Sequence, residues 1–345
     1  MTTMQACVFH GPGNLTIEEI PIPKPGPGEV LIKTSAASLC FSDIRVYRGE
    51  KYALPGVVQG HELAGSIVDI GKGAEGLKIG EDVVICPIVA CGRCFFCLQG
   101  KQNRCSQRVT LGYDLNGGLA EYALMPESLV RIGHLMKMPA GLPPDLACQT
   151  EPFACALYSL EVCHVGAGSS VAIIGAGPMG LTHLLIARAL GASRIIISDT
   201  EDERLAVAKD LGATRIVNPR KEDMKQATLD ATDGMGVDAV IVSVGNVGAI
   251  EAGLPLARKQ GWVNIFGGSP PESKLSIDPN LIHYNELFVT GTQNATVEHY
   301  RRSLELLTVL PDARKLVTHR FGVADTVKAF EARIEMKGLK AVIEF

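Results

Sequence analysis

The stretch SSVAIIGAGPMGLTHLLIARALGASRIIISD, residues 169–199, constrains the fold of this chain more than any other. An apolar run is followed by three glycines, Gly175, Gly177 and Gly180, then by a helical pattern and a second apolar run. This order predicts a strand, a tight turn, a helix and a parallel strand. In that context the G-x-G-x-x-G spacing indicates a dinucleotide site, because its glycines allow the turn and let the backbone approach a pyrophosphate.

The residues around these glycines predict which dinucleotide binds. Pro178 and Met179 open a helix whose N-terminal N–H groups can face an anion. Asp199 ends the second strand, where a carboxylate would bind ribose hydroxyls and repel a 2′-phosphate, which favours NAD over NADP. Arg204 leaves an alternative, since its guanidinium could approach a 2′-phosphate or lie along the adenine ring. A glycine turn with a purely structural role is the remaining interpretation.

Composition places the chain among globular proteins of the cytosol. Its 345 residues predict about two domains, and 46% hydrophobic against 20% charged residues allow a large core. A net charge of −4 without a Lys/Arg cluster argues against a nucleic-acid surface. No apolar segment is long enough to span a membrane, and the N-terminal residues lack a secretory pattern. We therefore expect a cytoplasmic protein without nucleic-acid or membrane partners, in a compartment where disulfides rarely persist.

Four cysteines follow one another closely in CGRCFFCLQGKQNRC, at Cys91, Cys94, Cys97 and Cys105. In a reducing compartment such a cluster usually binds metal, and pairs separated by two residues direct two sulfurs at one ion. Four thiolates indicate a structural zinc, because they leave no coordination position open for substrate. The alternative is a reduced cluster without metal. The spacing favours zinc, so we expect residues 86–110 to form a zinc lobe and the chemistry to lie elsewhere.

Two kinds of pattern divide the chain. The first 150 residues contain short runs rich in β-branched residues between Pro and Gly, which indicates a partly closed antiparallel barrel. From residue 165, apolar strands alternate with helices, including a helix over 247–261 and a strand over 262–268, which indicates a parallel sheet covered on both faces. The tail after residue 295 is predicted as helix, linker, helix and final strand, and could belong to either domain.

A second set of metal-ligand residues is scattered along the first half of the chain. Cys40 lies in SLCFSD, and His61 and Glu62 lie in GHELAG; thiolate and imidazole suit zinc. Because neighbouring side chains of a strand face opposite ways, His61 and Glu62 could bind one ion only where the backbone turns, for instance at Gly60. Otherwise Glu62 would orient the other ligands. Glu151, in TEPFACAL, is a further acid, although each residue taken alone is more often a core residue.

The order of these motifs resembles one family over the whole chain. A β-rich start with GHE, a four-cysteine lobe, GGLAEYAL, and then GAGPMG with Asp199 is similar to the zinc-dependent medium-chain dehydrogenase/reductase family, and most to its sorbitol (polyol) dehydrogenases. The resemblance implies an α/β fold: a GroES-like β-barrel catalytic domain plus a Rossmann coenzyme domain with a doubly wound parallel sheet. It assigns residues 1–151 and 289–345 to the first domain and 152–288 to the second.

Carried over by position, the resemblance implies a catalytic zinc held by Cys40, His61 and Glu62, with Glu151 binding it directly or through water. Ser42 matches a residue that hydrogen-bonds the reacting hydroxyl.

Two positions depart from the family pattern. Phe41 stands where glycine is common, which would reshape the pocket. Arg45 stands where many members have a histidine used in proton relay. A guanidinium is a poor proton shuttle, so Arg45 could instead contact a coenzyme phosphate or an acidic group of the substrate.

We therefore expect an NAD-dependent oxidoreductase with two zinc ions per chain that oxidises a secondary hydroxyl of a polyol or sugar alcohol to a ketone. A carboxylate among the zinc ligands favours a vicinal diol, because such a site expands readily to accept two hydroxyls. The alternatives are a threonine-type or sugar-alcohol-phosphate dehydrogenase of the same family and, from another class, a non-catalytic nucleotide-binding protein with structural zinc only. The family is usually dimeric or tetrameric, so we expect a homodimer or homotetramer.

Overall fold

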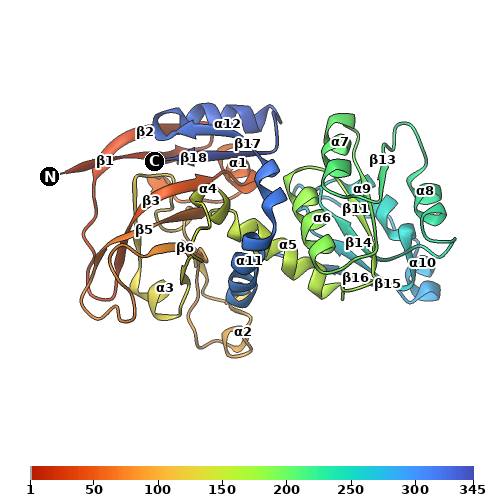
Figure 1. Cartoon of the computed structure of the whole chain (residues 1–345), viewed down its shortest axis with the longest axis horizontal. Helices are drawn as coiled ribbons and strands as arrows, with labels where there is room; N and C mark the ends of the chain where they lie inside the picture. Colours follow the sequence, from red (N-terminus) through yellow and green to blue (C-terminus); the bar gives the residue numbers. More distant parts are fainter. Residues whose placement is uncertain (1) are drawn as a thin grey trace. The chain divides into compact units, whose positions relative to one another are not determined.

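The alternating strands and helices after residue 165 form one parallel sheet in the computed structural model, which describes residues 2–345 (Figure 1). The strand order is β13-β12-β11-β14-β15-β16, in which the chain starts in the middle and winds outward in both directions. This is the order of a doubly wound dinucleotide-binding sheet. The strands are β11 (Ser170–Ile174), β12 (Arg194–Ser198), β13 (Arg215–Val217), β14 (Val237–Val242), β15 (Ala257–Ile265) and β16 (Phe288–Gly291).

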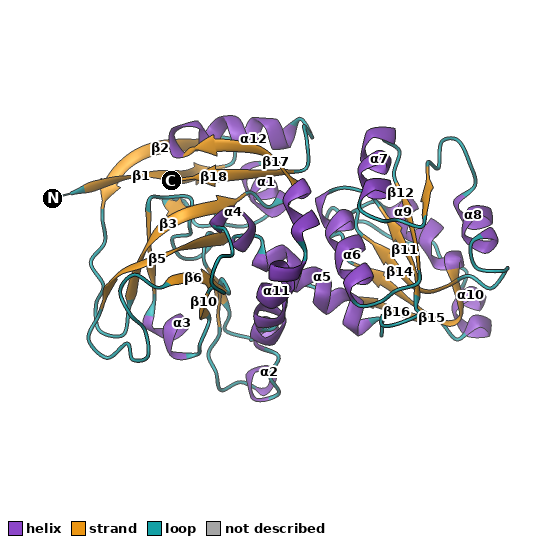
Figure 2. Ribbon diagram, viewed as in Figure 1, coloured by secondary structure: helices purple, strands orange, loops and turns teal. Residues whose placement is uncertain are grey.

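Helices cover both faces of this sheet (Figure 2). The strands are apolar and buried on both sides, for example Ile173, Ile196 and Val240 at 0% exposure, as expected for parallel strands between helix layers. The helices of this unit are α6 (Pro178–Ala189), α7 (Asp202–Asp210), α8 (Met224–Asp230), α9 (Val247–Gly253) and α10 (Pro279–Asn285).

One predicted helix is shorter than expected. The helix predicted over 247–261 ends at Gly253, and β15 begins at Ala257 instead of residue 262. Gly253 and Pro255 are the reason, because glycine weakens a helix interior and proline lacks the N–H that the helix requires. A short 3₁₀ turn over Leu254–Leu256 therefore separates the helix from the strand.

The β-rich unit forms two main sheets, whose strands are mostly antiparallel, and a separate two-stranded antiparallel sheet over residues 88–89 and 109–110. The larger sheet has the order β10-β6-β5-β3-β18-β17, with β9 also paired to β3, and the smaller has the order β2-β1-β4. The strands are β1 (Thr3–Gly11), β2 (Asn14–Pro21), β3 (Val30–Ser38), β4 (Val57–Val58), β5 (Glu62–Ile70), β6 (Asp82–Ile85), β7 (Ile88–Val89), β8 (Val109–Thr110), β9 (Tyr122–Met125), β10 (Leu135–Lys137), β17 (Val317–Gly322) and β18 (Lys340–Glu344).

The end of the chain returns to this β-rich unit. Strand β18 pairs antiparallel with β3, with Val342 opposite Ser38, and Ile343 belongs to the same core as Ile32 and Ile67. Strand β17, parallel to β18, lies where the sequence predicted only a linker. The helices of this part are α1 (Phe41–Tyr47), α2 (Phe95–Leu98), α3 (Glu127–Arg131), α4 (Pro144–Ala147), α11 (Val297–Val309) and α12 (Thr326–Ile334). Helix α5 (Thr150–Val162) begins in this unit and continues into the other unit at Cys155.

Contacts divide the chain into two compact units, Met1–Ala154 with Ala295–Phe345, and Cys155–Asn294. The expected boundary between residues 288 and 289 is wrong, because it cuts through β16, which is paired to β15 from Phe288 to Gly291. The strand has to stay with its sheet to satisfy its backbone hydrogen bonds. Among residues 2–345, no helix combines the length and apolar character needed to cross a membrane.

Candidate active site

Cys40 lies at the start of helix α1, shortly after strand β3. Its extended backbone makes it the N-cap residue, and its N–H donates to Asp43 Oδ2 at 3.0 Å. An acid at the third helical position that reaches back to the N-cap is one half of a capping box. This bond fixes the Cys40 sulfur and the Asp43 carboxylate relative to the end of β3.

A glycine turn brings His61 and Glu62 to one site. Gly60 has φ +92°, and a Cβ on it would lie 2.6 Å from Leu119 Cγ, so the position requires glycine. After this turn His61 precedes strand β5, and Glu62 opens the strand opposite Ser38. Both side chains are buried, at 5% and 1% exposure. Adjacent residues therefore meet, although a regular strand would place them on opposite faces.

Cys40, His61 and Glu62 form one candidate metal centre. One donor atom from each lies within 4.8 Å of the donor atoms of the others. Glu62 Oε1 is buried without a hydrogen-bond partner among the described residues, which is costly for a carboxylate oxygen. Thiolate, imidazole and carboxylate are zinc ligands, and three of them leave a coordination position for substrate. These residues therefore fit a catalytic zinc ion.

A buried lysine from the end of the chain holds the other oxygen of Glu62. Glu62 Oε2 accepts hydrogen bonds from Ser38 Oγ and Lys340 Nζ, and Lys340 also donates to the Leu39 carbonyl at 3.4 Å. Burial lowers the pKa of Lys340, but attraction to Glu62 and Cys40 outweighs it and leaves the pKa above its usual value. Lys340 is therefore positively charged and fixes the orientation of Glu62.

The imidazole of His61 faces a second carboxylate. His61 Nδ1 lies 3.1 Å from Asp43 Oδ1. Burial lowers the pKa of His61, but attraction and hydrogen bonding to Asp43 and Cys40 outweigh it and raise the pKa well above its usual value. The cause is the negative charge of Asp43 and Cys40 beside the imidazole. Such a site attracts a cation, which would replace the proton on His61.

Ser42 and Tyr113 form a pair of hydroxyl groups beside this centre. Ser42 Oγ lies 2.7 Å from Tyr113 Oη, and the rings of Tyr113 and His61 have centroids 5.3 Å apart. Burial, with the negative charges of Asp43 and Cys40, raises the pKa of Tyr113 well above its usual value. The phenol therefore keeps its proton and can donate a hydrogen bond.

Glu151 and Arg45, the two other predicted catalytic residues, lie outside the three-residue cluster. Glu151 is not among the residues whose donor atoms group together, although its charge acts on Tyr113 and Lys340. Arg45 forms an ion pair with Glu50 at 3.4 Å, which accounts for its charge without substrate. Zinc binding by Glu151 and a catalytic role for Arg45 both stay predictions.

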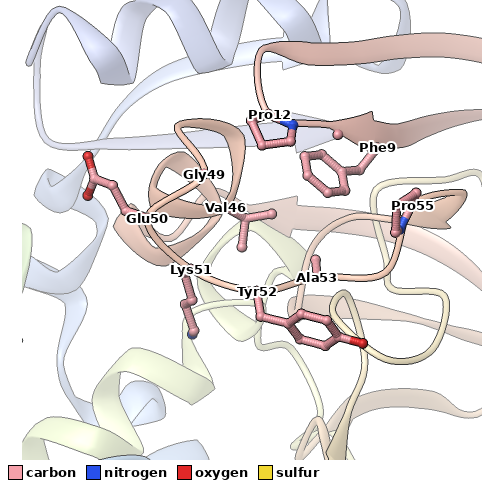
Figure 3. Close-up of a pocket in the computed structure, with 10 residues that line it drawn as sticks. Phe9, Pro12, Val46, Gly49, Glu50, Lys51, Tyr52, Ala53 and Pro55 are labelled. Atoms are coloured by element: carbon pink, nitrogen blue, oxygen red, sulfur yellow. The ribbon is translucent and has the colours of Figure 1, made fainter. Parts of the chain in front are cut away.

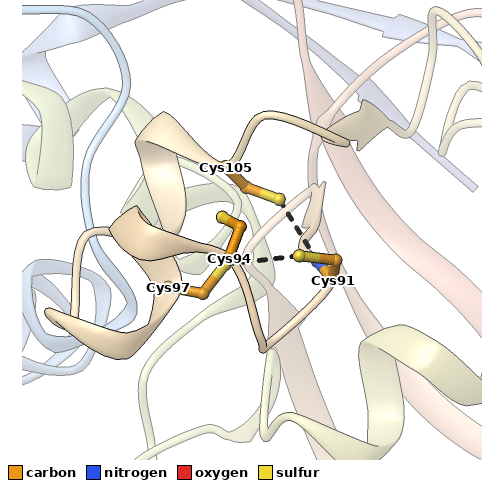
Figure 4. A group of neighbouring side chains, drawn as sticks. All are labelled: Cys91, Cys94, Cys97 and Cys105. Atoms are coloured by element: carbon orange, nitrogen blue, oxygen red, sulfur yellow. Dashed lines mark hydrogen bonds between the residues drawn. The ribbon is translucent and has the colours of Figure 1, made fainter.

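The four-cysteine lobe forms a second candidate metal centre (Figure 4). One sulfur from each of Cys91, Cys94, Cys97 and Cys105 lies within 4.8 Å of the others. Cys91 N–H donates to Cys105 Sγ at 3.3 Å, and backbone N–H groups hold the pKa of Cys94 well below its usual range. No disulfide joins any cysteine of the described residues. The arrangement fits a zinc ion enclosed by four sulfurs.

The glycines of the dinucleotide motif follow β11 in the second unit. Gly175 has φ +98°, and a Cβ on Gly180 would lie 1.7 Å from the Gly175 carbonyl oxygen, so both positions require glycine. Gly177 is the N-cap of α6, in which Pro178 and Met179 are the first residues. A Cβ on Gly177 would have only Arg204 Nη1 within 4 Å, at 3.9 Å. The turn is therefore tight where helix and strand pack, and open where a pyrophosphate would approach.

Asp199 follows β12 and is held by the turn itself. Its Oδ2 accepts a hydrogen bond from Ala176 N–H at 2.7 Å, and its Oδ1 accepts one from Glu201 N–H at 3.0 Å. Arg204 Nη1 lies 3.9 Å from Asp199 Oδ2. The carboxylate thus lies at the edge of the sheet where a ribose is expected, with Arg204 beside it.

Comparison with known proteins decides the family. The alcohol dehydrogenase GroES-like domain matches residues 26–139, and the zinc-binding dehydrogenase domain matches residues 178–308. L-threonine 3-dehydrogenase of Pyrococcus abyssi is 36% identical over 91% of this chain and 90% of that protein. The chain belongs to the zinc-dependent medium-chain dehydrogenases.

Two further relatives extend the comparison of this dehydrogenase. Sorbitol dehydrogenase of Halalkalibacterium halodurans is 32% identical over 97% of this chain and 96% of that protein. The crystal structure of a zinc-binding dehydrogenase from Sinorhizobium meliloti, bound to NADP, has a TM-score of 0.93 at 29% identity and covers 100% of both chains. The predicted family, the GroES-like and Rossmann folds and the use of zinc with a nicotinamide coenzyme are confirmed.

Three residues of this dehydrogenase site were missed from the sequence. Lys340 had a signal, because a lysine that opens the apolar strand KAVIEF needs a buried partner. Tyr113 and Ser38 had none, since only the folded chain brings them to Ser42 and Glu62.

Proposed function

We propose that this dehydrogenase oxidises a secondary alcohol that carries a second donor atom beside the reacting hydroxyl, with NAD as the hydride acceptor. The observation that supports this most is the cluster of Cys40, His61 and Glu62, in which a buried carboxylate oxygen lacks a partner. In the reaction, the carbinol carbon would lose a hydride to NAD and the hydroxyl would release its proton to water, which yields a ketone, NADH and a proton.

The residues of the chain would divide this work. Zinc, when bound by Cys40, His61 and Glu62, supplies a Lewis acid that lowers the pKa of the substrate hydroxyl. Ser42 would accept or donate the hydrogen bond that orients that hydroxyl, and Tyr113, 2.7 Å away, holds the Ser42 hydroxyl in place. With the phenol protonated, Tyr113 leaves Ser42 Oγ free to act as the acceptor from substrate.

Asp199 supports NAD as the coenzyme. Its carboxylate lies beside the glycine turn and would repel the 2′-phosphate of NADP. Arg204 lies 3.9 Å from Asp199 Oδ2, so its charge is directed at this carboxylate. The Sinorhizobium relative was crystallised with NADP, so the test has to compare NAD with NADP.

Two substrate classes satisfy the requirement for a neighbouring donor. A polyol has a second hydroxyl beside the first, and the sorbitol dehydrogenase relative supports this class. A 2-amino-3-hydroxy acid has an amine in that place, and the threonine dehydrogenase relative, at higher identity, supports this second candidate.

The test is a substrate panel with the purified, zinc-loaded protein. Sorbitol, D-gluconate, L-threonine and 2-propanol are each assayed by NADH absorbance, with NADP in parallel. We expect kcat/KM for at least one substrate with a neighbouring donor to exceed that of 2-propanol by about tenfold or more, and NAD to be preferred. Faster oxidation of 2-propanol, or no oxidation of any of the four, would contradict the proposal.

A further inference from the structure

The loop after α1 places a lysine next to the candidate active site. The Nζ of Lys51 lies 4.1 Å from the centroid of the Tyr113 ring. This ring also packs against His61, and its hydroxyl is 2.7 Å from Ser42 Oγ. The ammonium group, a candidate metal ligand and the residue expected to bind the reacting hydroxyl therefore all contact the same tyrosine.

The backbone around this lysine is tied on both sides. Glu50 N–H donates to the Arg45 carbonyl at 2.8 Å, which continues the end of α1, and Leu54 N–H donates to the Tyr113 carbonyl at 2.8 Å. The loop is thus attached both to the helix that begins at Cys40 and to the residue whose ring the lysine covers. A cation held over an aromatic face has a preferred position, so the ammonium is oriented before any ligand arrives.

The charge of Lys51 is not neutralised by its acidic neighbour. Glu50 pairs instead with Arg45 at 3.4 Å and Arg48 at 4.0 Å. Figure 3 shows the Glu50 and Lys51 side chains leaving the loop in different directions, with Lys51 directed away from Phe9. Among residues 2–345, Lys51 forms no ion pair within 4.0 Å, in contrast to Lys137, Lys221, Lys328 and Lys340.

Acidic groups lie near Lys51, but none of them pairs with it directly. Loss of hydration lowers the pKa of Lys51, although Cys40, Asp43 and Glu151 attract its positive charge. A partly dehydrated ammonium without a direct carboxylate partner gains from a charge-assisted hydrogen bond. Of these three residues, Cys40 is a candidate zinc ligand, and a zinc ion bound there would offset part of the negative charge.

We propose that Lys51 binds a carboxylate group of the substrate and so makes the enzyme selective for hydroxy acids over neutral alcohols. The inference rests on the proposed function, because it concerns the substrate of the same site. Two sources share this chemistry, a hydroxy amino acid and a polyhydroxy acid. In either case the hydroxyl is oxidised next to Ser42 while the carboxylate contacts the ammonium group beside the Tyr113 ring.

Binding without turnover tests the inference directly. The zinc-loaded protein without coenzyme is titrated in a calorimeter with two pairs that differ in charge, L-threonine against L-threoninamide and D-gluconate against sorbitol. In the wild-type protein the acid of at least one pair should bind more tightly than its neutral counterpart. Lys51→Met should weaken binding of that acid about 10- to 100-fold and change the neutral compound less than about twofold, because only the acid loses a charged partner.

Two further variants separate recognition from a general effect of charge. Lys51→Arg keeps the charge and should retain most of the affinity for the acid. Lys24→Met removes an exposed lysine from the same unit and should leave both affinities unchanged. Equal weakening of the acid and the neutral compound, or a wild-type protein that binds neither acid more tightly, overturns the inference.

The coenzyme assay keeps the two proposals distinguishable. If neutral polyols are oxidised with NAD and Lys51→Met has no selective effect on the acids, the role of Lys51 is wrong and the proposed function stands. If acids bind through Lys51 but no alcohol is oxidised, the proposed function is wrong.

Discussion

The two candidate metal centres of this dehydrogenase use related ligands in opposite settings. The four-cysteine lobe collects its ligands from one short segment, residues 91–105, and two of them, Cys97 and Cys105, are buried at 7% exposure while the others are partly exposed. The centre at Cys40 takes its ligands from a helix N-terminus and from the start of strand β5. The lobe is built from local sequence, whereas the second centre exists only after the barrel has folded.

The surroundings of the two centres differ as much as their ligands. Sulfur atoms in the lobe accept hydrogen bonds from backbone N–H groups, such as Cys91 N–H and Gln107 N–H to Cys105 Sγ. Around the Cys40 centre, by contrast, the ligands face charged side chains: Asp43 lies beside His61, and Lys340 pairs with Glu62. Backbone donors stabilise four fixed thiolates, while side-chain charges can tune a site that exchanges ligands. This contrast predicts that damage to the four-cysteine lobe disrupts the local structure, whereas damage to the Cys40 centre abolishes activity.

The largest expected effect comes from exchanging one ligand in each centre. Cys40→Ser should reduce kcat/KM about 1000-fold or more, because it removes a ligand of the Lewis acid, with little change in thermal unfolding. Cys97→Ser should instead open the lobe, so that trypsin cleaves at Lys101 about tenfold faster or more than in the wild type. Each variant should retain about one zinc ion per chain, measured by atomic absorption.

A buried cysteine outside both centres provides the control for this exchange. Cys163→Ala alters a buried thiol of the second unit and should keep about two zinc ions and the wild-type rate. The contrast between the centres would be refuted by either of two results. Trypsin could cleave Cys40→Ser as fast as Cys97→Ser, or Cys97→Ser could lose its activity while the lobe still resists trypsin.

The second largest effect is expected at the buried ion pair that only the Cys40 centre has. Lys340→Met leaves Glu62 buried without its counter-charge, which should lower the free energy of unfolding by about 3–5 kcal/mol. The loss should be larger after metal removal than with zinc bound, because zinc also balances the Glu62 carboxylate. Urea unfolding with and without a chelator measures both values.

An exposed lysine of the neighbouring strand serves as the matched control. Lys33→Met on β3 changes the same charge at the surface and should stay within about 0.5 kcal/mol of the wild type. If Lys340→Met were no more destabilising than Lys33→Met, Lys340 would not be the counter-charge of Glu62.

The contrast between the centres also explains which parts of the site the sequence could predict. The spacing of Cys91, Cys94, Cys97 and Cys105 carries its own geometry, because a short segment can close on an ion without help from the rest of the chain. The strand–turn–helix pattern around Gly175 is local in the same sense, and so the Rossmann sheet was predictable from alternating apolar runs. Both rest on interactions between residues close in sequence.

Local sequence patterns could not predict contacts between residues that lie far apart in the chain. Nothing near Glu62 indicates that Lys340 will pair with it, since strand β18 joins β3 only when the end of the chain returns to the barrel. Tyr113 likewise comes from a turn far from Ser42 and His61. The resemblance to the family supplied the ligands Cys40, His61 and Glu62, but not the residues that hold them. The residues that hold the ligands come from distant positions, and only the fold shows which of them lie beside the site.

The smallest of the expected effects concerns the carboxylate that faces His61, for which the lobe has no counterpart among its sulfur contacts. Asp43→Asn keeps the size and most of the hydrogen bonding to the Cys40 N–H, but removes the negative charge 3.1 Å from His61 Nδ1. Partners of this kind typically contribute 10- to 100-fold to metal affinity or activity, and we expect a loss of about that size here. Zinc affinity, measured by competition with a chromogenic chelator, should fall for one ion only, because the lobe is unaffected.

Asp69→Asn, on the exposed side of the strand that Glu62 begins, is the matched control and should leave both zinc ions in place. Equal weakening of both ions by Asp43→Asn, or none, would show that this carboxylate serves the fold of helix α1 and not the metal.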